Sequence, residues 1–130
     1  MKNDVRVVRL PNSGASSFQM PNSIRCKVLS LKCLVATSAT VGNRFFVMVI
    51  RDKSGEIKLV IGLPSTMAAS QNTFVTLAPG LGGTYGVVVH HQSIPDETIL
   101  EVDDLISFYD SQDISVADRI TDVVAVVELL

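Results

Sequence analysis

The chain has 130 residues, which is the length of one domain and too short for two independent hydrophobic cores. Its formal net charge of −2 argues against a nucleic-acid binder, because phosphate contacts need clustered Lys and Arg and the basic residues here are scattered. Only 18% of the residues are charged, below the usual share of about 25%. We therefore expect neighbouring molecules to cover part of the surface, and the alternative is a monomer covered by Ser, Thr, Asn and Gln.

The N-terminal segment combines a short alternating run with a polar stretch. The first four residues, Met-Lys-Asn-Asp, lead straight into polar and alternating sequence, so we expect no secretory signal. Residues 4–10 alternate like a short edge strand, and residues 11–17 are rich in Ser, Gly and Pro. We expect residues 1–20 to form an N-terminal arm or long loop, and residues 21–130 to form the folded domain.

Residues 23–36 form a long extended run in which the apolar positions change phase after Val28. Such a change indicates a β-bulge or a strand that moves from one sheet to another. Cys26 and Cys33 lie on this run, and at a rise of about 3.3 Å per residue they are too far apart to form a disulfide. We expect buried, reduced thiols in a protein made in the cytosol.

The centre of the sequence predicts a β-hairpin. Residues 45–50 form an apolar run typical of a strand buried on both faces, and residues 57–61 form a second run. Gly55 lies in the turn between them and supplies the positive φ that a short hairpin loop needs.

The remaining sequence continues as short strands separated by turns. We predict some helical character over residues 65–70, with Met67 as its anchor. The last run, residues 119–130, places Ile120 with Val124 and Val126 on one face. Together the pattern indicates an all-β chain, a jelly-roll-like antiparallel β-sandwich of about eight strands in a single domain.

The sequence predicts no catalytic, cofactor-binding or metal-binding residues, and we expect a protein that is not an enzyme. His90 and His91 are adjacent on a strand, so their side chains point to opposite faces and cannot share a metal. The carboxylates of the C-terminal third lack the spacing of a calcium loop, although a calcium site there stays open. No apolar run approaches the ~20 residues of a membrane span.

Arginines begin two of the predicted core strands. Arg44 follows a Gly-Asn turn, and Arg119 follows Asp118 directly. Arginine forms strong bidentate pairs with carboxylates, so we predict structural ion pairs rather than catalytic roles. The residues predicted to form these pairs are Arg44, Asp52, Asp118 and Arg119.

Several of these segments resemble a group of small structural proteins from tailed-phage virions. The resemblance is carried by residues 37–44, ending in Val-Gly-Asn-Arg, and by residues 51–55. Residues 78–80, 108–111 and 117–118 are also similar, and residues 101–104 depart from the pattern because the usual Pro-x-Gly is missing. The resemblance covers roughly residues 24–130 and implies a virion structural protein with a jelly-roll-like sandwich.

On this basis we expect a capsid decoration, or cement, protein that stabilises the outer shell by bridging capsid subunits. It would be made in the host bacterial cytoplasm and become part of the virion. The expected partners are itself, as a dimer or trimer, and the major capsid protein or another virion protein, with no nucleic acid and no membrane. Apolar residues of the N-terminal segment are the predicted assembly contacts: Val5, Val7, Leu10, Phe18 and Met20.

Two other functions remain open at this point. The first is a tail, neck or fibre-base component of the virion. The second is a carbohydrate-binding β-sandwich module, which normally places aromatic side chains in a groove. The chain has five Phe, two Tyr and no Trp, mostly inside β runs, so the sequence gives this function little support.

Overall fold

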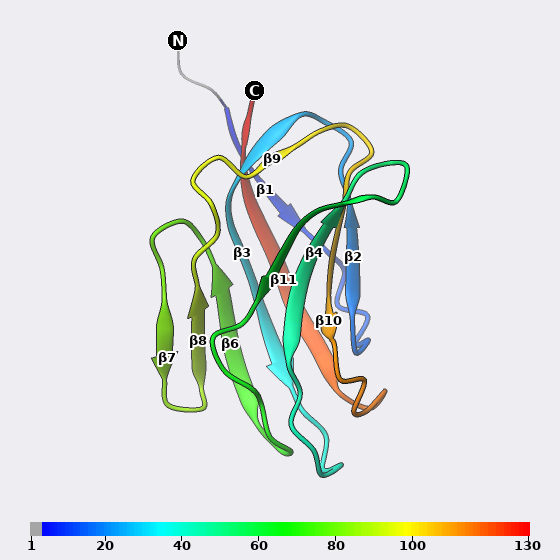
Figure 1. Cartoon of the computed structure of the whole chain (residues 1–130), viewed down its shortest axis with the longest axis vertical. Coiled ribbons are helices and arrows are strands. Elements are labelled where there is room, and N and C mark those ends of the chain that lie inside the picture. The colour runs from blue at the N-terminus through cyan, green and yellow to red at the C-terminus, as the bar shows by residue number, and fades with distance from the viewer. Residues whose placement is uncertain (1–3) are drawn as a thin grey trace.

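The computed structural model describes residues 4–130, which form two β-sheets packed against each other (Figure 1). The strands are β1 (Val5–Arg9), β2 (Phe18–Pro21), β3 (Cys26–Ala36), β4 (Phe46–Arg51), β5 (Ile57–Gly62), β6 (Asn72–Leu77), β7 (Gly83–Tyr85), β8 (Val89–Gln92), β9 (Ile99–Leu100), β10 (Leu105–Asp110) and β11 (Arg119–Leu129). No helix occurs in this part of the chain, and hence none that could cross a membrane. The predicted single-domain all-β sandwich is confirmed, with more strands than expected.

The two sheets differ in size. The larger sheet has seven strands, in the order β1-β11-β3-β6-β8-β7, with β9 paired to β3. The smaller sheet has four strands, in the order β2-β10-β4-β5. Neighbouring strands are antiparallel except for β6 and β8, which run parallel. Strands β1 and β7 therefore form the edges of the larger sheet, and β2 and β5 form the edges of the smaller one.

The N-terminal segment belongs to the sandwich, which corrects the expected arm for residues 4–20. Strand β1 pairs along β11, and β2 pairs along β10. The predicted boundary after residue 20 falls inside β2, where buried Phe18 and Met20 alternate with exposed neighbours. Strand β2 was not predicted from the sequence pattern, because this strand is only four residues long and follows a Ser-rich stretch. Residues 1–3 of the predicted arm lie outside the described residues.

The predicted central hairpin is confirmed. Strand β4 pairs antiparallel with β5, and Gly55 in the turn between them has a φ of 91°. Residues 46–50 of β4 are all buried, as expected for a strand covered on both faces. Strand β5, by contrast, is an edge strand whose residues are exposed or only partly buried.

Two irregularities interrupt the pairing of β3 with β11. One lies where Val126 pairs with Ser30 and Val127 pairs with Val28. This is the place where the apolar positions change phase after Val28. The other lies between Thr121 and Val124, where Asp122 has a φ of 54°. Because of this second bulge, Ile120 points into the core together with Val123, Ala125 and Val127. The prediction that Ile120 shares a face with Val124 and Val126 is therefore wrong.

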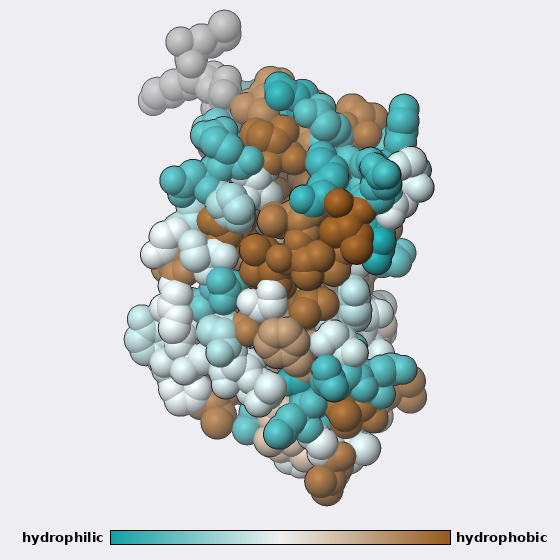
Figure 2. Space-filling view, viewed as in Figure 1, coloured by the Kyte–Doolittle hydropathy of each residue, from teal (hydrophilic) through white to brown (hydrophobic). Residues whose placement is uncertain are grey.

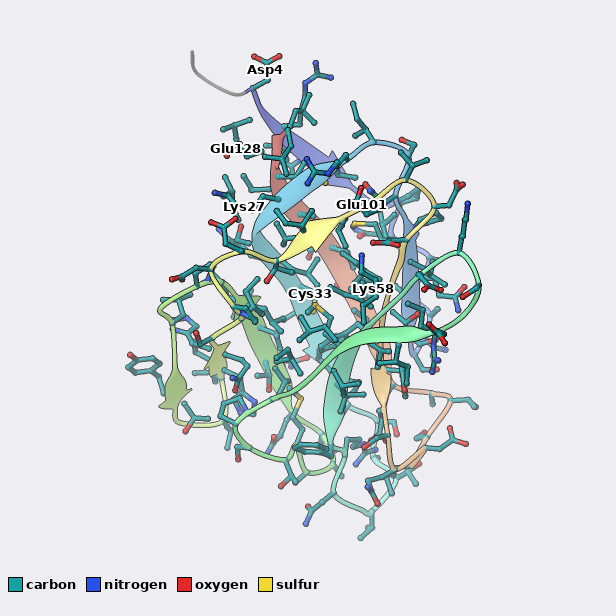
Figure 3. All side chains as sticks on the ribbon, turned by 45° about the horizontal axis from the view of Figure 1, so that its top comes forward. Asp4, Lys27, Cys33, Lys58, Glu101 and Glu128 are labelled. Atoms are coloured by element: carbon teal, nitrogen blue, oxygen red, sulfur yellow. The ribbon has the colours of Figure 1, made fainter. Side chains whose placement is uncertain are left out.

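The core lies between the sheets. The ring of Phe108 stacks between Phe18 and Phe46, with ring centroids 5.5 and 5.4 Å apart. Cys26 and Cys33 are buried and unbridged, as expected, and Figure 3 shows Cys33 in the interior.

The helical character predicted for residues 65–70 is wrong, because this segment is irregular. Its Met67 is nevertheless a buried anchor, and its backbone pairs with that of Arg44.

Candidate interaction surfaces

The five residues predicted for assembly lie in different environments. Phe18 and Met20 are part of the core, with 9% and 6% of their surface exposed, which corrects their assignment to an exposed assembly surface. Leu10 is half-buried against the same core. Val5 and Val7 are more than half exposed on the edge strand β1, so they remain candidates for assembly.

The predicted ion pair of Arg44 is present and buried. The Arg44 guanidinium donates from Nε and Nη2 to the two carboxylate oxygens of Asp118, at 3.0 and 3.1 Å. It also donates to the carbonyl of Gly42, and Asp118 accepts a further bond from the backbone N–H of Ser38. Burial by itself raises the pKa of the Asp118 carboxyl, but the hydrogen bonds and the charge of Arg44 outweigh it and hold this pKa below its usual value. The arrangement ties the turn before β4 to the start of β11 and is structural.

The other two residues of this prediction form no ion pair within residues 4–130, which corrects it. The Asp52 carboxylate accepts bonds from the backbone N–H groups of Ser54 and Glu56 and shapes the β4–β5 turn. The Arg119 guanidinium donates to the carbonyls of Val116 and Asp118. Both side chains form hydrogen bonds with backbone groups that are close to them in sequence. Such a short-range contact loses less conformational entropy than an ion pair between residues far apart in the chain.

Asp110, one of the carboxylates of the C-terminal third, also forms structural hydrogen bonds. Asp110 accepts bonds from the backbone N–H groups of Phe45, Gln112 and Ile114. Among the described residues, no three His, Cys, Asp or Glu side chains gather as metal ligands would. His90 is buried with an unpartnered Nδ1, and burial lowers its pKa. His91 lies on the opposite face of β8, next to the ring of Tyr85.

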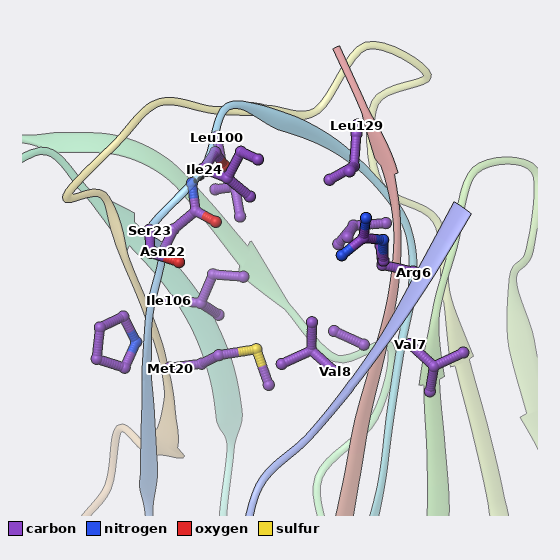
Figure 4. Close-up of a pocket in the computed structure, with 13 residues that line it drawn as sticks. Arg6, Val7, Val8, Met20, Asn22, Ser23, Ile24, Leu100, Ile106 and Leu129 are labelled. Atoms are coloured by element: carbon purple, nitrogen blue, oxygen red, sulfur yellow. Dashed lines mark hydrogen bonds between the residues drawn. The ribbon is translucent and has the colours of Figure 1, made fainter. Parts of the chain in front are cut away.

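A cavity of about 290 Å³ opens between the edge strands β1 and β2 (Figure 4). Met20 and Ile106 line it from the smaller sheet, and Val8 and Leu129 line it from the larger one. The lining is largely apolar, so this cavity can accept an aliphatic side chain from a partner. Its size is at the lower end of the range for small-molecule sites.

A row of apolar side chains, two of them exposed and two partly buried, crosses the outer face of the larger sheet. The strand registers place Leu34 beside Phe74, Phe74 beside Val89, and Val89 beside Tyr85, on the adjacent strands β3, β6, β8 and β7. We call these four residues the outer apolar row. Phe74 and Tyr85 are 60% and 61% exposed. With strands about 4.8 Å apart, the row spans roughly 14 Å.

Charged residues occupy the outer face of the larger sheet near the first residues of β3. There Lys27 of β3 forms an ion pair with Glu128 of β11, with Nζ and Oε1 3.5 Å apart (Figure 3). The outer face therefore has a charged pair near one end and the outer apolar row near the other. Apolar patches on a soluble protein mark contacts with other molecules more often than scattered single residues do.

Sequence reasoning missed the outer apolar row, although part of its signal is visible. Residues 73–77 alternate, and Thr73, Val75 and Leu77 are the buried positions of β6. Phe74 therefore falls on the solvent face, where a phenylalanine is unexpected. Its neighbours Leu34, Val89 and Tyr85 come from strands whose pairing only the tertiary structure gives.

Comparison with known proteins provides no relative. No protein-family model, curated protein sequence or solved structure matches this chain.

Proposed function

We propose that the protein is a non-enzymatic structural component of a tailed-phage virion, a capsid decoration protein with a jelly-roll-like sandwich. The outer apolar row carries the proposal, because it presents aligned apolar side chains on a rigid sheet. In this proposal the row packs against the major capsid protein. The protein is made in the host bacterial cytoplasm and then bridges neighbouring capsid subunits in the virion.

The position of the phage-like segments in the fold is consistent with a structural protein. The segment ending in Arg44 and the segment containing Asp118 are far apart in sequence, and their side chains form the buried ion pair. These residues hold two loops together and are closed off from solvent. The sequence features shared with the phage group therefore serve the scaffold, which leaves the exposed faces as the places where a partner binds.

Adhesion of this kind depends on buried area. Complete burial of a large apolar side chain contributes about 1.5–3 kcal/mol. A joint that is stable alone needs about 1,000 Å² or more of complementary surface, which is more than one row supplies. Repetition on a capsid relaxes this requirement, because a subunit held at several contacts binds with avidity.

The test uses purified, decoration-free heads of the virus that encodes this chain. The protein is mixed with the heads, which are then sedimented, and we expect it to pellet at a fixed stoichiometry. Phe74→Ser and Tyr85→Ser should each weaken binding by about tenfold or more, because each removes about 1.5 kcal/mol or more of apolar burial. Val41→Ser is the matched control, since Val41 is 91% exposed in a turn outside the row. The proposal fails if wild-type protein stays in the supernatant, or if both row variants bind like the control.

Other virion positions use the same contact chemistry. Sedimentation with purified tails in place of heads would transfer the proposal to a tail, neck or fibre-base component.

A carbohydrate-binding module is the second candidate, and the exposure of Phe74 and Tyr85 on one sheet face favours it. Aromatic faces pack against sugar rings, and two of them on a sheet form a flat platform. Binding on a glycan array that Phe74→Ser and Tyr85→Ser both abolish would support this function. Retention of head binding in excess soluble glycan would argue against it.

A further inference from the structure

Strand β5 has an open edge. It is the last strand of the smaller sheet and pairs only with β4 among the described residues. The backbone N–H of Leu63 donates to the carbonyl of Phe46, which fixes the alternation of the ladder. The backbone groups of Leu59 and Ile61 accordingly point to β4. Those of Val60 point away from it, toward solvent.

The side chains along this edge are apolar. Val60 is 52% exposed on the outer face of the smaller sheet, and Ile57 is 54% exposed. Leu59 and Ile61 lie on the opposite face and pack at the rim of the core, only partly buried. Figure 2 shows an apolar patch at the centre of the viewed face, over β5. An apolar edge with unpaired backbone groups favours pairing with another strand.

Lys58 is the one charged residue within β5, and it does not prevent another strand from pairing with this edge. Natural sheets often protect an edge with a lysine that repels an approaching strand. Here Lys58 sits at a bulge in the β4–β5 pairing, and its ammonium binds the carboxylate of Asp104 in the same chain. Asp104 is buried and also accepts a bond from the backbone N–H of Glu101. The charge of Lys58 is thus neutralised within its own subunit.

The residues around Val60 are complementary to themselves. In an antiparallel pair of two β5 strands centred on Val60, each Val60 faces the other Val60 on the outer side. Leu59 faces the partner copy's Ile61 on the core side, and this contact occurs twice. Lys58 faces Gly62 of the other copy, where the ring of Phe45 covers the glycine. The unpaired N–H and C=O of Val60 in one copy then meet those of the other.

We propose that a second copy of this chain binds here, β5 against β5, and joins the two smaller sheets into one continuous sheet. The edge strand β1 fits a second copy less well. Antiparallel pairing centred on Val7 brings Arg6 opposite Val8 and Arg9 opposite Val5, so charged side chains face apolar ones. Strand β7 offers an edge of three residues only. The pairing of β5 forms in free solution and does not depend on the proposed role in a virion.

Analytical ultracentrifugation over a concentration series tests the proposal on the full chain. We expect a reversible dimer for the wild-type protein and a monomer for Val60→Lys, which places two ammonium groups face to face at the centre of the joint. Val7→Lys is the matched control, because Val7 is a comparably exposed valine on the other long edge. It should remain a dimer. A monomeric wild type, or equal association of Val60→Lys and wild type, overturns the proposal.

A cross-link supplies a second measurement that needs no loss of association. Directly paired residues that exchange hydrogen bonds have Cα atoms about 5.5 Å apart, which suits a disulfide. Val60→Cys should therefore form a covalent dimer under mild oxidation, whereas Val7→Cys should not. The native thiols of Cys26 and Cys33 are buried and do not compete. Equal cross-linking of the two variants would refute pairing at β5 and leave the capsid proposal standing.

Discussion

Replacing Asp118 by asparagine should destabilise the fold more than any exposed charge substitution. The side chain keeps its size but loses its charge, so the guanidinium of Arg44 is left without a counter-ion. Arg44 and Asp118 are 0% and 1% exposed, and water cannot reach the arginine to replace the lost partner. The carbonyls of Gly42 and Ser38 remain as acceptors, but neither carries a net charge.

The size of the effect follows from the burial. Removing one member of a buried ion pair costs about 3–5 kcal/mol, because it leaves an uncompensated charge in the interior. The whole free energy of unfolding of a domain is about 5–15 kcal/mol, so Asp118→Asn should lower it by a large fraction. Glu101→Gln is the control, since it breaks the Arg25–Glu101 pair, in which both side chains are about half exposed. That pair should contribute about 1 kcal/mol or less.

Urea denaturation followed by far-ultraviolet circular dichroism measures both variants. The pKa of Asp118 lies below its usual value of 3.8, so the carboxylate stabilises the folded state above this pH and loses that effect as the pH falls through the lowered pKa. The difference in the free energy of unfolding between wild type and Asp118→Asn should therefore become smaller below pH 3.8. The reasoning would be refuted if Asp118→Asn lowered the free energy of unfolding no more than Glu101→Gln does.

Three further substitutions or treatments test the core. Phe108→Ala should cost about 3–5 kcal/mol in urea denaturation, because it empties the space between the rings of Phe18 and Phe46, and an unchanged midpoint would contradict this. Burial lowers the pKa of His90 below 6.5, so the unfolded chain takes up a proton first and stability should fall as the pH drops below 6.5. His90→Leu should make that part of the stability profile flatter than in wild type. Burial raises the pKa of the Cys33 thiol to about 12, so iodoacetamide should label Cys33 only after unfolding, as mass spectrometry can establish.

The sequence alone determined much of the local structure. The apolar run of β4 and the turn at Gly55 predicted the central hairpin, because strand periodicity and positive φ are properties of neighbouring residues. The phase change after Val28 predicted a bulge for the same reason. Prediction failed where the local signal was weak: β2 is too short for its alternation to stand out, and the bulge at Asp122 moved Ile120 to the other face.

The tertiary structure decided which strands became neighbours, and with that the candidate sites. Alternation shows which residues share a face of one strand, but it does not show which strand lies beside it. The partner of Arg44 proved to be Asp118 because the turn before β4 and the start of β11 meet in space. Likewise, the outer apolar row exists because four strands align, and β5 has an open edge because β4 is its only neighbour among residues 4–130. Such contacts depend on long-range hydrogen bonding and packing, which no short stretch of sequence encodes.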